Sequence, residues 1–539
     1  MKRFSLVLLL FLFGVTATLY ATLWNAPPLT WDDNSNIFGN PYFVMHLWWG
    51  VWTDPYFGLY VPVISSLWAG LYSLGQGDAW PYRAANIVMH LLNCGLVYGL
   101  LRALARRWNF ANPIVVSLSV AVFALHPLQA GAVAWISGGR DLLATGLALA
   151  AVCVYFANRG RVGYVLSLVL FVLALLSKPS VVVLPVVIGM CDIKLMGRSL
   201  KGALVRMLPW FAGSMLAVIV TYAAQLAHFV DAVDWCLRPW VVLDTYQFYL
   251  QKIFWPWPLS GNYARTPDWV VADFQRLWFT LGFWLPTGFI IWSWRRTRWL
   301  FGIWALLLLP VSGLVPFGYQ QISGVADHYN YASMIPLSIV AMVGLQQLLQ
   351  SGVRHKDVLA YGISAVAIGL WIFVVTLRLP VWTSDRNFFS DMAVTAPSAY
   401  STAIGMSVVL CDQSQEYEKG VEWTEKALAA RPNDILALAN RAYCLLHAGH
   451  NRAVIEMEYY LDKIDVERLA LEQPTGYSSF LASIGSAMIQ ENELQAGYQY
   501  LCEAYKVKPS EPNHARNLEV ATEILKKHGL EPSCDHDSE

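Results

Sequence analysis

The chain has 539 residues and a formal net charge of zero, with 37 basic and 37 acidic side chains. Hydrophobic residues make up 56% of it and charged residues only 14%, which in a chain of this length indicates membrane spans rather than a large water-soluble core. The balanced charge gives no bulk electrostatic reason to expect binding to nucleic acid. We therefore predict a membrane protein with no nucleic-acid partner.

Apolar runs follow one another through residues 1–380, and most charges fall in the short stretches between them. The first run follows Met1-Lys2-Arg3 and extends to about Leu23. We interpret it as an uncleaved span, with a signal peptide as the alternative. Ten further spans are predicted at about 84–104, 113–126, 141–157, 162–177, 180–196, 204–227, 274–293, 299–316, 333–350 and 358–378.

Basic residues cluster in alternate loops between these spans. Cytoplasmic loops are enriched in Lys and Arg, so the pattern predicts a cytoplasmic N-terminus and, after about eleven spans, an outward C-terminus. The clusters are Arg102/Arg106/Arg107, Arg159/Arg161, Lys194/Arg198/Lys201/Arg206, Arg295/Arg296/Arg298 and Arg354/Lys356. The outward face then receives the loops 24–83 and 228–273, the turns at 127–140 and 177–178, the stretch 317–332, and everything after about 379.

Two outward segments combine apolar and aromatic residues. Loop 24–83 is rich in Trp and Tyr, and its apolar stretch 60–74 predicts a helix lying in the membrane interface. The segment 246–258 has the aromatic composition of the headgroup layer. We expect both to lie along the membrane surface.

A different composition begins after a linker predicted at 381–398. Residues 399–530 form amphipathic segments, and 531–539 form a polar tail. The segments 427–432 and 504–509 share an Ala-x4-Pro ending, in which Pro stops the second helix of a tetratricopeptide (TPR) unit. Residues 434–464 predict a middle helix pair, followed by an insertion through 473–474, so three repeats could stack. We predict an extramembrane TPR-like α-solenoid that binds an acceptor or partner; unpatterned helices are the alternative.

The eight cysteines are scattered, without a CxxC pair or a His at ligand spacing. Small buried side chains are the expectation for those in apolar runs and in the C-terminal helices, namely Cys94, Cys153, Cys191, Cys411, Cys444 and Cys502. The sequence thus predicts neither a zinc site nor a disulfide framework.

Paired acids come directly after the first span, at Asp32 and Asp33. Two adjacent carboxylates at this place could act as general bases or metal ligands. A solvated cap or turn is the structural alternative.

Further polar groups lie at the outward ends of later spans. His126 ends one span, and the Gly-rich stretch 137–139 with Arg140 opens the next, where backbone N–H groups can hold an anion; a tight turn with an Arg–Asp pair explains it equally well. Lys178 lies between two apolar runs, where an unpaired charge is costly, and snorkelling is the alternative. Asp327, His328 and Tyr329 open another span from the same side. None of these motifs is specific alone, and their predicted location on one face of the membrane is the stronger indication of a functional site.

The order of these motifs resembles the transmembrane-and-TPR protein O-mannosyltransferases and their bacterial relatives, members of the GT-C superfamily that use lipid-phosphate sugars. The resemblance covers most of the chain. It rests on Trp31-Asp32-Asp33, Tyr60-Val61-Pro62-Val63, the stretch 81–90 with Arg83, the stretch 126–142, Leu176-Ser177-Lys178-Pro179, Phe254-Trp255-Pro256 and Ala326-Asp327-His328-Tyr329. Three positions depart from the family: Gly131 replaces a Glu, Gly139 replaces an Arg (Arg140 follows one place later), and His328 replaces an Arg.

The resemblance implies an all-α protein with a GT-C-like membrane domain over 1–380. Its implied activity is inverting transfer of mannose or another hexose from a polyprenyl-phosphate donor to an acceptor hydroxyl. Asp32 or Asp33 would be the base. Arg140, Lys178 and His328 would stabilise the phosphate. The remaining donor-binding residues would be Arg83, His126, Asp327 and Tyr329.

Cationic side chains can manage a monophosphate leaving group, so no obligatory metal is predicted, although the paired acids leave a divalent ion open. The implied acceptor is a polypeptide Ser or Thr held at the solenoid. A glycan or lipid acceptor remains an alternative, as do a non-catalytic TPR scaffold, which Gly131 favours, and a transporter, which the lack of mid-span charges disfavours. We expect a bacterial inner membrane with the site facing the periplasm, although an endoplasmic reticulum satisfies the same topology.

Overall fold

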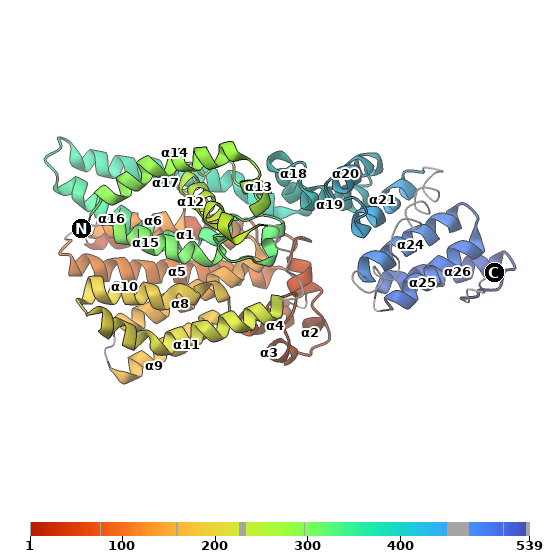
Figure 1. Ribbon diagram of the computed structural model, residues 1–539, viewed down its shortest axis with the longest axis horizontal. Coiled ribbons are helices and arrows are strands. Elements are labelled where there is room, and N and C mark those ends of the chain that lie inside the picture. The colour runs from red at the N-terminus through yellow and green to blue at the C-terminus, as the bar shows by residue number, and fades with distance from the viewer. Residues whose placement is uncertain are drawn as a thin grey trace. The chain divides into compact units, whose positions relative to one another are not determined.

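The computed structural model describes residues 2–75, 77–110, 112–157, 160–225, 233–295, 297–449, 474–509 and 511–534. Within these ranges the regular structure is helical, and only an isolated bridge joins Tyr56 to Leu59. The all-α prediction is confirmed. The chain divides into two compact units, Met1–Phe388 and Phe389–Glu539 (Figure 1), and this division falls inside the predicted linker 381–398.

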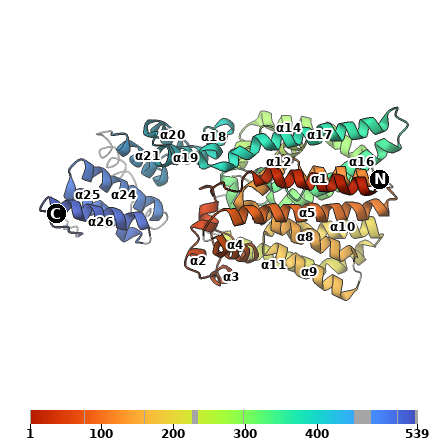
Figure 2. The ribbon, with the colours of Figure 1, turned by 180° about the vertical axis from the view of Figure 1, so that it is seen from behind.

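The first unit is a set of long helices around α5 (Trp80–Arg107), which packs against α1 (Lys2–Ala21), α6 and α8 (Figures 1 and 2). The other long helices are α6 (Pro113–Ala124), α8 (Gly139–Ala157), α9 (Arg161–Leu175), α10 (Leu184–Met196), α11 (Leu200–Gln225), α12 (Arg238–Phe254), α14 (Phe274–Ser293), α15 (Arg298–Leu308), α16 (Met334–Gln350) and α17 (Lys356–Arg378). Other α-helices of the unit are α2 (Pro41–Val44), α3 (Gly50–Thr53), α4 (Pro62–Gly75), α7 (Gln129–Ala134) and α13 (Pro267–Val271).

Among the described residues, six helical segments are long and apolar enough to cross a bilayer: Arg3–Ala21, Trp80–Arg107, Ile136–Ala157, Pro179–Met196, Leu200–Gln225 and Lys356–Thr383. Four other predicted spans coincide with shorter apolar helices, and 274–293 coincides with α14. The structure is therefore compatible with a membrane protein. The count of about eleven spans and their orientation stay predictions; the end of span 204–227, Arg159 and Arg296 lie outside the described residues.

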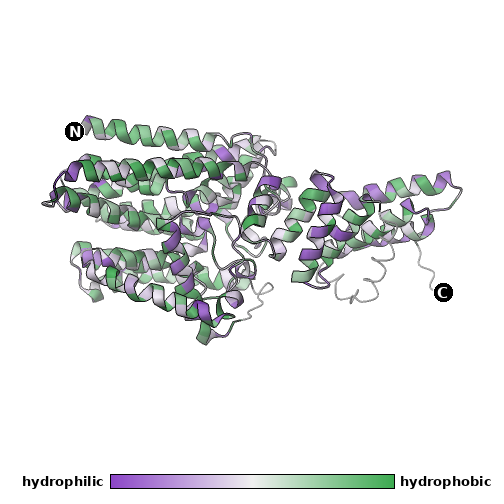
Figure 3. Cartoon of the chain, turned by 90° about the horizontal axis from the view of Figure 1, so that it is seen from above, coloured by the Kyte–Doolittle hydropathy of each residue, from purple (hydrophilic) through white to green (hydrophobic). Residues whose placement is uncertain are grey.

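Apolar side chains also cover the outside of these helices. Figure 3 shows hydrophobic residues running along the helices of the first unit. Phe11 of α1, Ile219 of α11 and Phe373 of α17 are among the exposed large hydrophobic residues. Apolar surface on this scale is unusual for a water-soluble chain and is what a lipid environment requires.

Polar side chains on one face of α5 organise the end of the unit where the site lies. Arg83, Asn86, His90 and Asn93 are spaced by three or four residues, so they share a helix face. All four are buried. A buried polar group must find a hydrogen-bond partner, and these four bind segments that follow α6 and precede α16.

The second unit begins within α18 (Asp385–Thr395) and continues through helices that pack on their neighbours in chain order. Gly485 and Gly497 permit a close approach of two of them, because a Cβ on Gly485 would lie 2.6 Å from the carbonyl oxygen of Gly497. The TPR assignment stays a prediction, and residues 450–473 of its middle repeat lie outside the described residues. The helices are α19 (Tyr400–Val408), α20 (Tyr417–Ala430), α21 (Ile435–His447), α24 (Pro474–Gln490), α25 (Leu494–Val507) and α26 (Pro512–Lys527).

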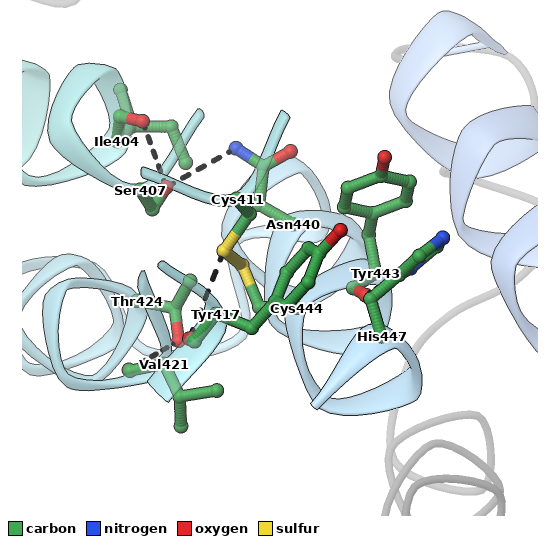
Figure 4. The surroundings of a disulfide bond; sticks show 10 residues. All are labelled: Ile404, Ser407, Cys411, Tyr417, Val421, Thr424, Asn440, Tyr443, Cys444 and His447. Carbon is green, nitrogen blue, oxygen red and sulfur yellow. Dashed lines mark hydrogen bonds between the residues drawn. A yellow bond between two sulfur atoms is a disulfide. The ribbon is translucent and has the colours of Figure 1, made fainter. Parts of the chain in front are cut away.

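Two disulfides in the second unit correct the prediction that the chain has none. They join Cys411 to Cys444 and Cys502 to Cys534, across sequence separations of 33 and 32 residues. Each pair meets only because the helical packing brings distant positions together, so no short spacing marks it in the sequence. Figure 4 shows the first disulfide among Tyr417, Tyr443 and His447. The four cysteines of the first unit are free.

This distribution predicts a thiol count. Unfolded under non-reducing conditions, the full chain isolated from its own membrane should take up four maleimide labels, rising to eight after reduction. Mass spectrometry of the labelled protein measures both numbers. Eight labels without reduction would contradict the two disulfides, and mapping the labelled peptides would show which pair is absent.

Candidate functional site

Asp33 is completely buried and holds two loops together. Its carboxylate accepts hydrogen bonds from the backbone N–H of Leu29, at 3.1 Å, and from both the N–H and the hydroxyl of Ser137, at 2.9 and 2.6 Å. Burial raises the pKa of Asp33, while these donors and the charge of Arg83 oppose the rise. With its oxygens occupied in this way, Asp33 fixes the loop that precedes α8 rather than presenting a free base.

Asp32 has the opposite environment. Its side chain remains 25% exposed, and one carboxylate oxygen lies 3.6 Å from a guanidinium nitrogen of Arg140. Burial raises the pKa of Asp32 to about 6; Arg140 lowers it and Asp33 raises it further. A partly accessible carboxylate with this pKa is suited to accept a proton near neutral pH. The structure thus separates two acids that the sequence left equivalent.

Arg140 is held above two aromatic rings. Its guanidinium carbon lies 5.9 Å from the ring centroids of both Trp68 and Trp135, and its Nε donates to the carbonyl oxygen of Ser137. Gly139 gives this arrangement its room, because a Cβ there would lie 2.8 Å from the side-chain oxygen of Asn86. The departure at Gly139 therefore has a packing reason, and the Arg one place later is the cation at the site.

A second ion pair lies at the start of α8. The Lys178 ammonium is 2.5 Å from an oxygen of Asp141, the residue after Arg140, and 5.2 Å from the ring centroid of Tyr329. Burial lowers the pKa of Lys178, and Asp141 opposes the shift. Two cations from different segments, Arg140 and Lys178, are thus each paired with an acid near the start of α8.

His328 lies between Trp135 and Tyr329, with ring centroids 5.1 and 4.5 Å away. Burial and the charges of Lys178 and Arg140 hold its pKa well below the usual range. The imidazole is therefore neutral at physiological pH and can contribute a hydrogen bond but no positive charge. The resemblance implies that His328 helps to stabilise the phosphate, and a neutral imidazole would do so by hydrogen bonding.

Asp327 precedes this histidine and is also buried. It accepts a hydrogen bond of 2.6 Å from the hydroxyl of Tyr263. The pKa of Tyr319 is raised, mainly by burial and in addition by the negative charges of Asp32 and Asp327, so Tyr319 lies near both acids. Tyr263 and Tyr319 are polar residues of the site that the sequence interpretation missed, because isolated tyrosines in an aromatic-rich loop carry no distinguishing pattern.

The structure does not bring Arg83 and His126 to these ion pairs as ligands. Arg83 donates to the backbone carbonyl oxygens of Ala134, Pro27 and Trp382. His126 accepts from the N–H of Leu128 at Nδ1, so its Nε2 donates to the carbonyl oxygen of Ile253 at 3.0 Å. Both side chains have structural partners here, which the sequence could not distinguish from donor binding.

Asn86 and Ser137 also escaped the sequence interpretation as site-building residues. Asn86 donates to the carbonyl oxygen of Trp135 at 2.8 Å, one turn of α5 after Arg83. Its spacing from Arg83 and His90 on a single helix face was the signal available. Among the described residues, no group of three or more His, Cys, Asp or Glu side chains could hold a metal ion.

A large apolar cavity adjoins the second ion pair. It has a volume of 640 Å³ and is lined by residues of α5, α8, α10, α15 and α16. At one end the cavity is lined by Asp141, in the first turn of α8, together with Lys178 and Tyr329. Ala157, in the last turn of α8, also lines it. Along the helix axis, Asp141 and Ala157 are separated by about 24 Å, close to the thickness of a bilayer core.

Comparison with known proteins gives one weak match. Protein O-mannosyl-transferase F38B6.6 of Caenorhabditis elegans is 31% identical over 150 residues, which are 28% of this chain and 21% of that protein. The chain thus aligns with about a fifth of the length of the curated relative. No family model and no solved structure matches the chain. The similarity supports a glycosyltransferase-like family at this general level.

The contrast between the two aspartates predicts different mutant phenotypes. Asp33→Ala should lower the melting temperature of the purified full chain, because each buried donor left unpaired costs about 1–3 kcal/mol. Asp32→Asn should lower the melting temperature by less, because the side chain is partly solvated and loses only its ion pair with Arg140. Thermal unfolding in one detergent compares them, and a larger loss of stability in Asp32→Asn would contradict these assignments.

Proposed function

We propose that this protein is an inverting, GT-C-type glycosyltransferase that moves a hexose, mannose in the first instance, from a polyprenyl-phosphate donor to an acceptor hydroxyl. The weak similarity to a protein O-mannosyl-transferase supports the reaction class. The observation that carries the donor assignment is the apolar cavity of 640 Å³ whose lining includes the Lys178–Asp141 pair. Arg140 precedes Asp141 in the chain, and it is paired with Asp32 beside this end of the cavity.

A lipid-phosphate donor matches this combination of apolar volume and charge. The polyprenyl chain would occupy the cavity, where apolar walls replace acyl chains at little cost in free energy. Its phosphate would then lie beside Lys178, and the attached sugar would point toward Arg140 and Asp32. A free nucleotide sugar has no apolar tail to fill such a cavity, so it fits the site less well.

In the proposed reaction Asp32 is the base and the lipid phosphate is the leaving group. The acceptor oxygen forms a bond to the anomeric carbon from the face opposite the phosphate, and its proton passes to Asp32. The bond between the anomeric carbon and the phosphate oxygen breaks, and its electron pair leaves with the lipid phosphate. Because attack and departure occur on opposite faces, the configuration inverts.

Arg140 and Lys178 would stabilise the leaving phosphate, which gains a negative charge as the glycosidic bond breaks. Both cations are held before the donor arrives, by Asp32 and Asp141 respectively. Neutral His328 and the hydroxyl of Tyr329 could add hydrogen bonds. This set of side chains performs the charge stabilisation without an obligatory metal ion.

The proposed side of the membrane is the outward, periplasmic face of a bacterial inner membrane. Disulfides persist in oxidising compartments such as the periplasm, and the second unit contains two. The alternating basic loops support the same orientation for the loops that carry Asp32, Arg140 and Lys178. The helical second unit would bind the acceptor, for which we propose a polypeptide Ser or Thr.

The first experiment measures transfer from polyprenyl-phosphate mannose to a Ser/Thr peptide by the purified full chain, for the wild type and Asp32→Asn. The substitution should reduce kcat by at least about a hundredfold, the lower range for loss of a general base. The Asp54→Asn variant is the control, because Asp54 is an exposed acid in the same outward loop. Binding of the donor with no transfer by the wild type would favour a non-catalytic scaffold.

The pH dependence of the same assay tests Asp32 as the base. A base must be deprotonated, so kcat/KM, which reports the ligand-free protein, should rise as the pH increases through about 6, the value to which burial raises the pKa of Asp32. Arg140 lowers this pKa, so Arg140→Met should move the rising limb to higher pH as well as slow the reaction. A limb that stays in place in Arg140→Met would argue against Asp32.

Filling the cavity tests the lipid site independently. Gly99 of α5 lines the cavity, and a Cβ there would meet no atom within 4 Å, so Gly99→Leu enters the cavity without disturbing the helix. Overfilling costs about 1–3 kcal/mol, so the KM for the lipid donor should rise by about tenfold. Gly362→Leu is the matched control: Gly362, in α17, also has open space around it but does not line the cavity. Equal KM values for both variants would contradict the assignment.

A further inference from the structure

A small pocket lies beside Gly131, the position where the resembled family has Glu. Its volume is 20 Å³, enough for about one water-sized group. A Cβ on Gly131 would lie 3.5 Å from Cβ of Asp327, 3.7 Å from Cζ2 of Trp382 and 3.8 Å from the backbone nitrogen of His328. A longer side chain at this position would therefore extend among these groups and occupy the pocket.

Two tryptophans that line the pocket have hydrogen-bond donors without a partner among the described residues. The indole nitrogens of Trp135 and Trp382 are buried, and the two side chains are only 5% and 6% exposed. Cζ2 of Trp382 belongs to the N–H edge of its indole, so that edge is the one nearest Gly131. A buried donor left without a partner is costly, and a polar group of a ligand in the pocket would remove that cost.

The neighbouring charges indicate which kind of group fits. Asp327 lines the pocket, and its negative charge disfavours an anion there. Neutral His328, also in the lining, supplies no compensating positive charge. The pocket therefore suits a group that accepts a hydrogen bond from an indole N–H and carries no negative charge. A sugar hydroxyl is such a group.

The pocket is joined to the proposed phosphate site through one residue. Trp135 lines the pocket, and its ring also lies 5.9 Å from the guanidinium carbon of Arg140. A group that contacts this tryptophan is therefore about one sugar ring from a phosphate held by Arg140. This places the pocket within reach of the transferred sugar rather than of the lipid chain.

We propose that the Gly131 pocket is a subsite for one hydroxyl or hydroxymethyl group of the donor sugar, bound by the indole N–H groups of Trp135 and Trp382. Gly131 is then a specificity-determining residue, because a Glu side chain would fill the space that admits this substituent. The inference rests on the proposed use of a lipid-phosphate sugar.

The test compares the affinity of the full chain for polyprenyl-phosphate mannose and for bare polyprenyl phosphate. The ratio of the two dissociation constants isolates the contribution of the sugar. In the wild type the sugar should tighten binding. In Trp382→Phe, which keeps an aromatic ring but removes the N–H, the ratio should fall by roughly three- to tenfold, the loss of one hydrogen bond. Gly131→Glu should abolish the preference, and Gly131→Ala, whose Cβ meets only ordinary contacts, should reduce it.

Trp210→Phe is the matched control. Trp210 of α11 is buried with an unpartnered indole N–H among the described residues, but it does not line this pocket, so its ratio should equal that of the wild type. Affinity for bare polyprenyl phosphate should stay unchanged in all four variants and shows that each is folded. Unchanged ratios in Trp382→Phe and both Gly131 variants would overturn the subsite while leaving the lipid-phosphate donor intact. Wild-type protein that binds neither lipid would instead remove the proposed function, and the subsite with it.

Discussion

The site depends on the requirement that buried polar side chains in an apolar helix bundle find partners. Arg83, Asn86, His90 and Asn93 lie on one face of α5, where neither water nor lipid can satisfy them. Arg83 and Asn86 donate to backbone carbonyl oxygens of the segment that leads into α8, while His90 and Asn93 bind the hydroxyl of Tyr331 at 2.9 and 3.0 Å. Non-helical chain at this depth is tolerated because α5 satisfies its carbonyl groups, and this fixes the start of α8 and the turn that carries Asp327 and His328 at the same end of the unit.

This scaffold gives Asp32 and Asp33 different surroundings. Asp33 completes the scaffold from the other side: it accepts from Leu29 and Ser137, so the loop that follows α1 is tied to the segment that Asn86 already holds. Consecutive residues in a turn point in different directions, and Asp32 is thereby left partly exposed against Arg140. The position of Asp32 therefore depends on Asp33, because moving Asp33 would displace both Asp32 and Arg140.

Sequence reasoning recovered the parts of this arrangement that composition and periodicity encode. The apolar runs coincide with helices. Asp32 is marked by its adjacent carboxylate, Arg140 by the Gly-rich turn before it, and Lys178 by the cost of a charge between two apolar runs. The roles of Arg83 and His126 could not be predicted, since a buried side chain that binds a carbonyl oxygen and one that binds a ligand have the same sequence pattern. The disulfides escaped for a related reason: Cys411 and Cys444 meet only when α20 folds back between them, and Gly420 leaves room for the bond because a Cβ there would clash with the sulfur of Cys411.

Pairing each cation with an acid has a consequence for the proposed reaction. An empty site with two isolated cations would be expensive in an apolar surrounding, and the acids Asp32 and Asp141 lower that cost by holding Arg140 and Lys178 in place. In the proposed reaction the acceptor proton would pass to Asp32, so that carboxylate would lose its charge while the lipid phosphate would gain one. Arg140 would then be freed from its acid when the phosphate needs a counter-charge, and the total charge of the site would not change. The same ion pair, whose atoms lie 3.6 Å apart, would thus stabilise first the empty protein and then the transition state of the proposed reaction.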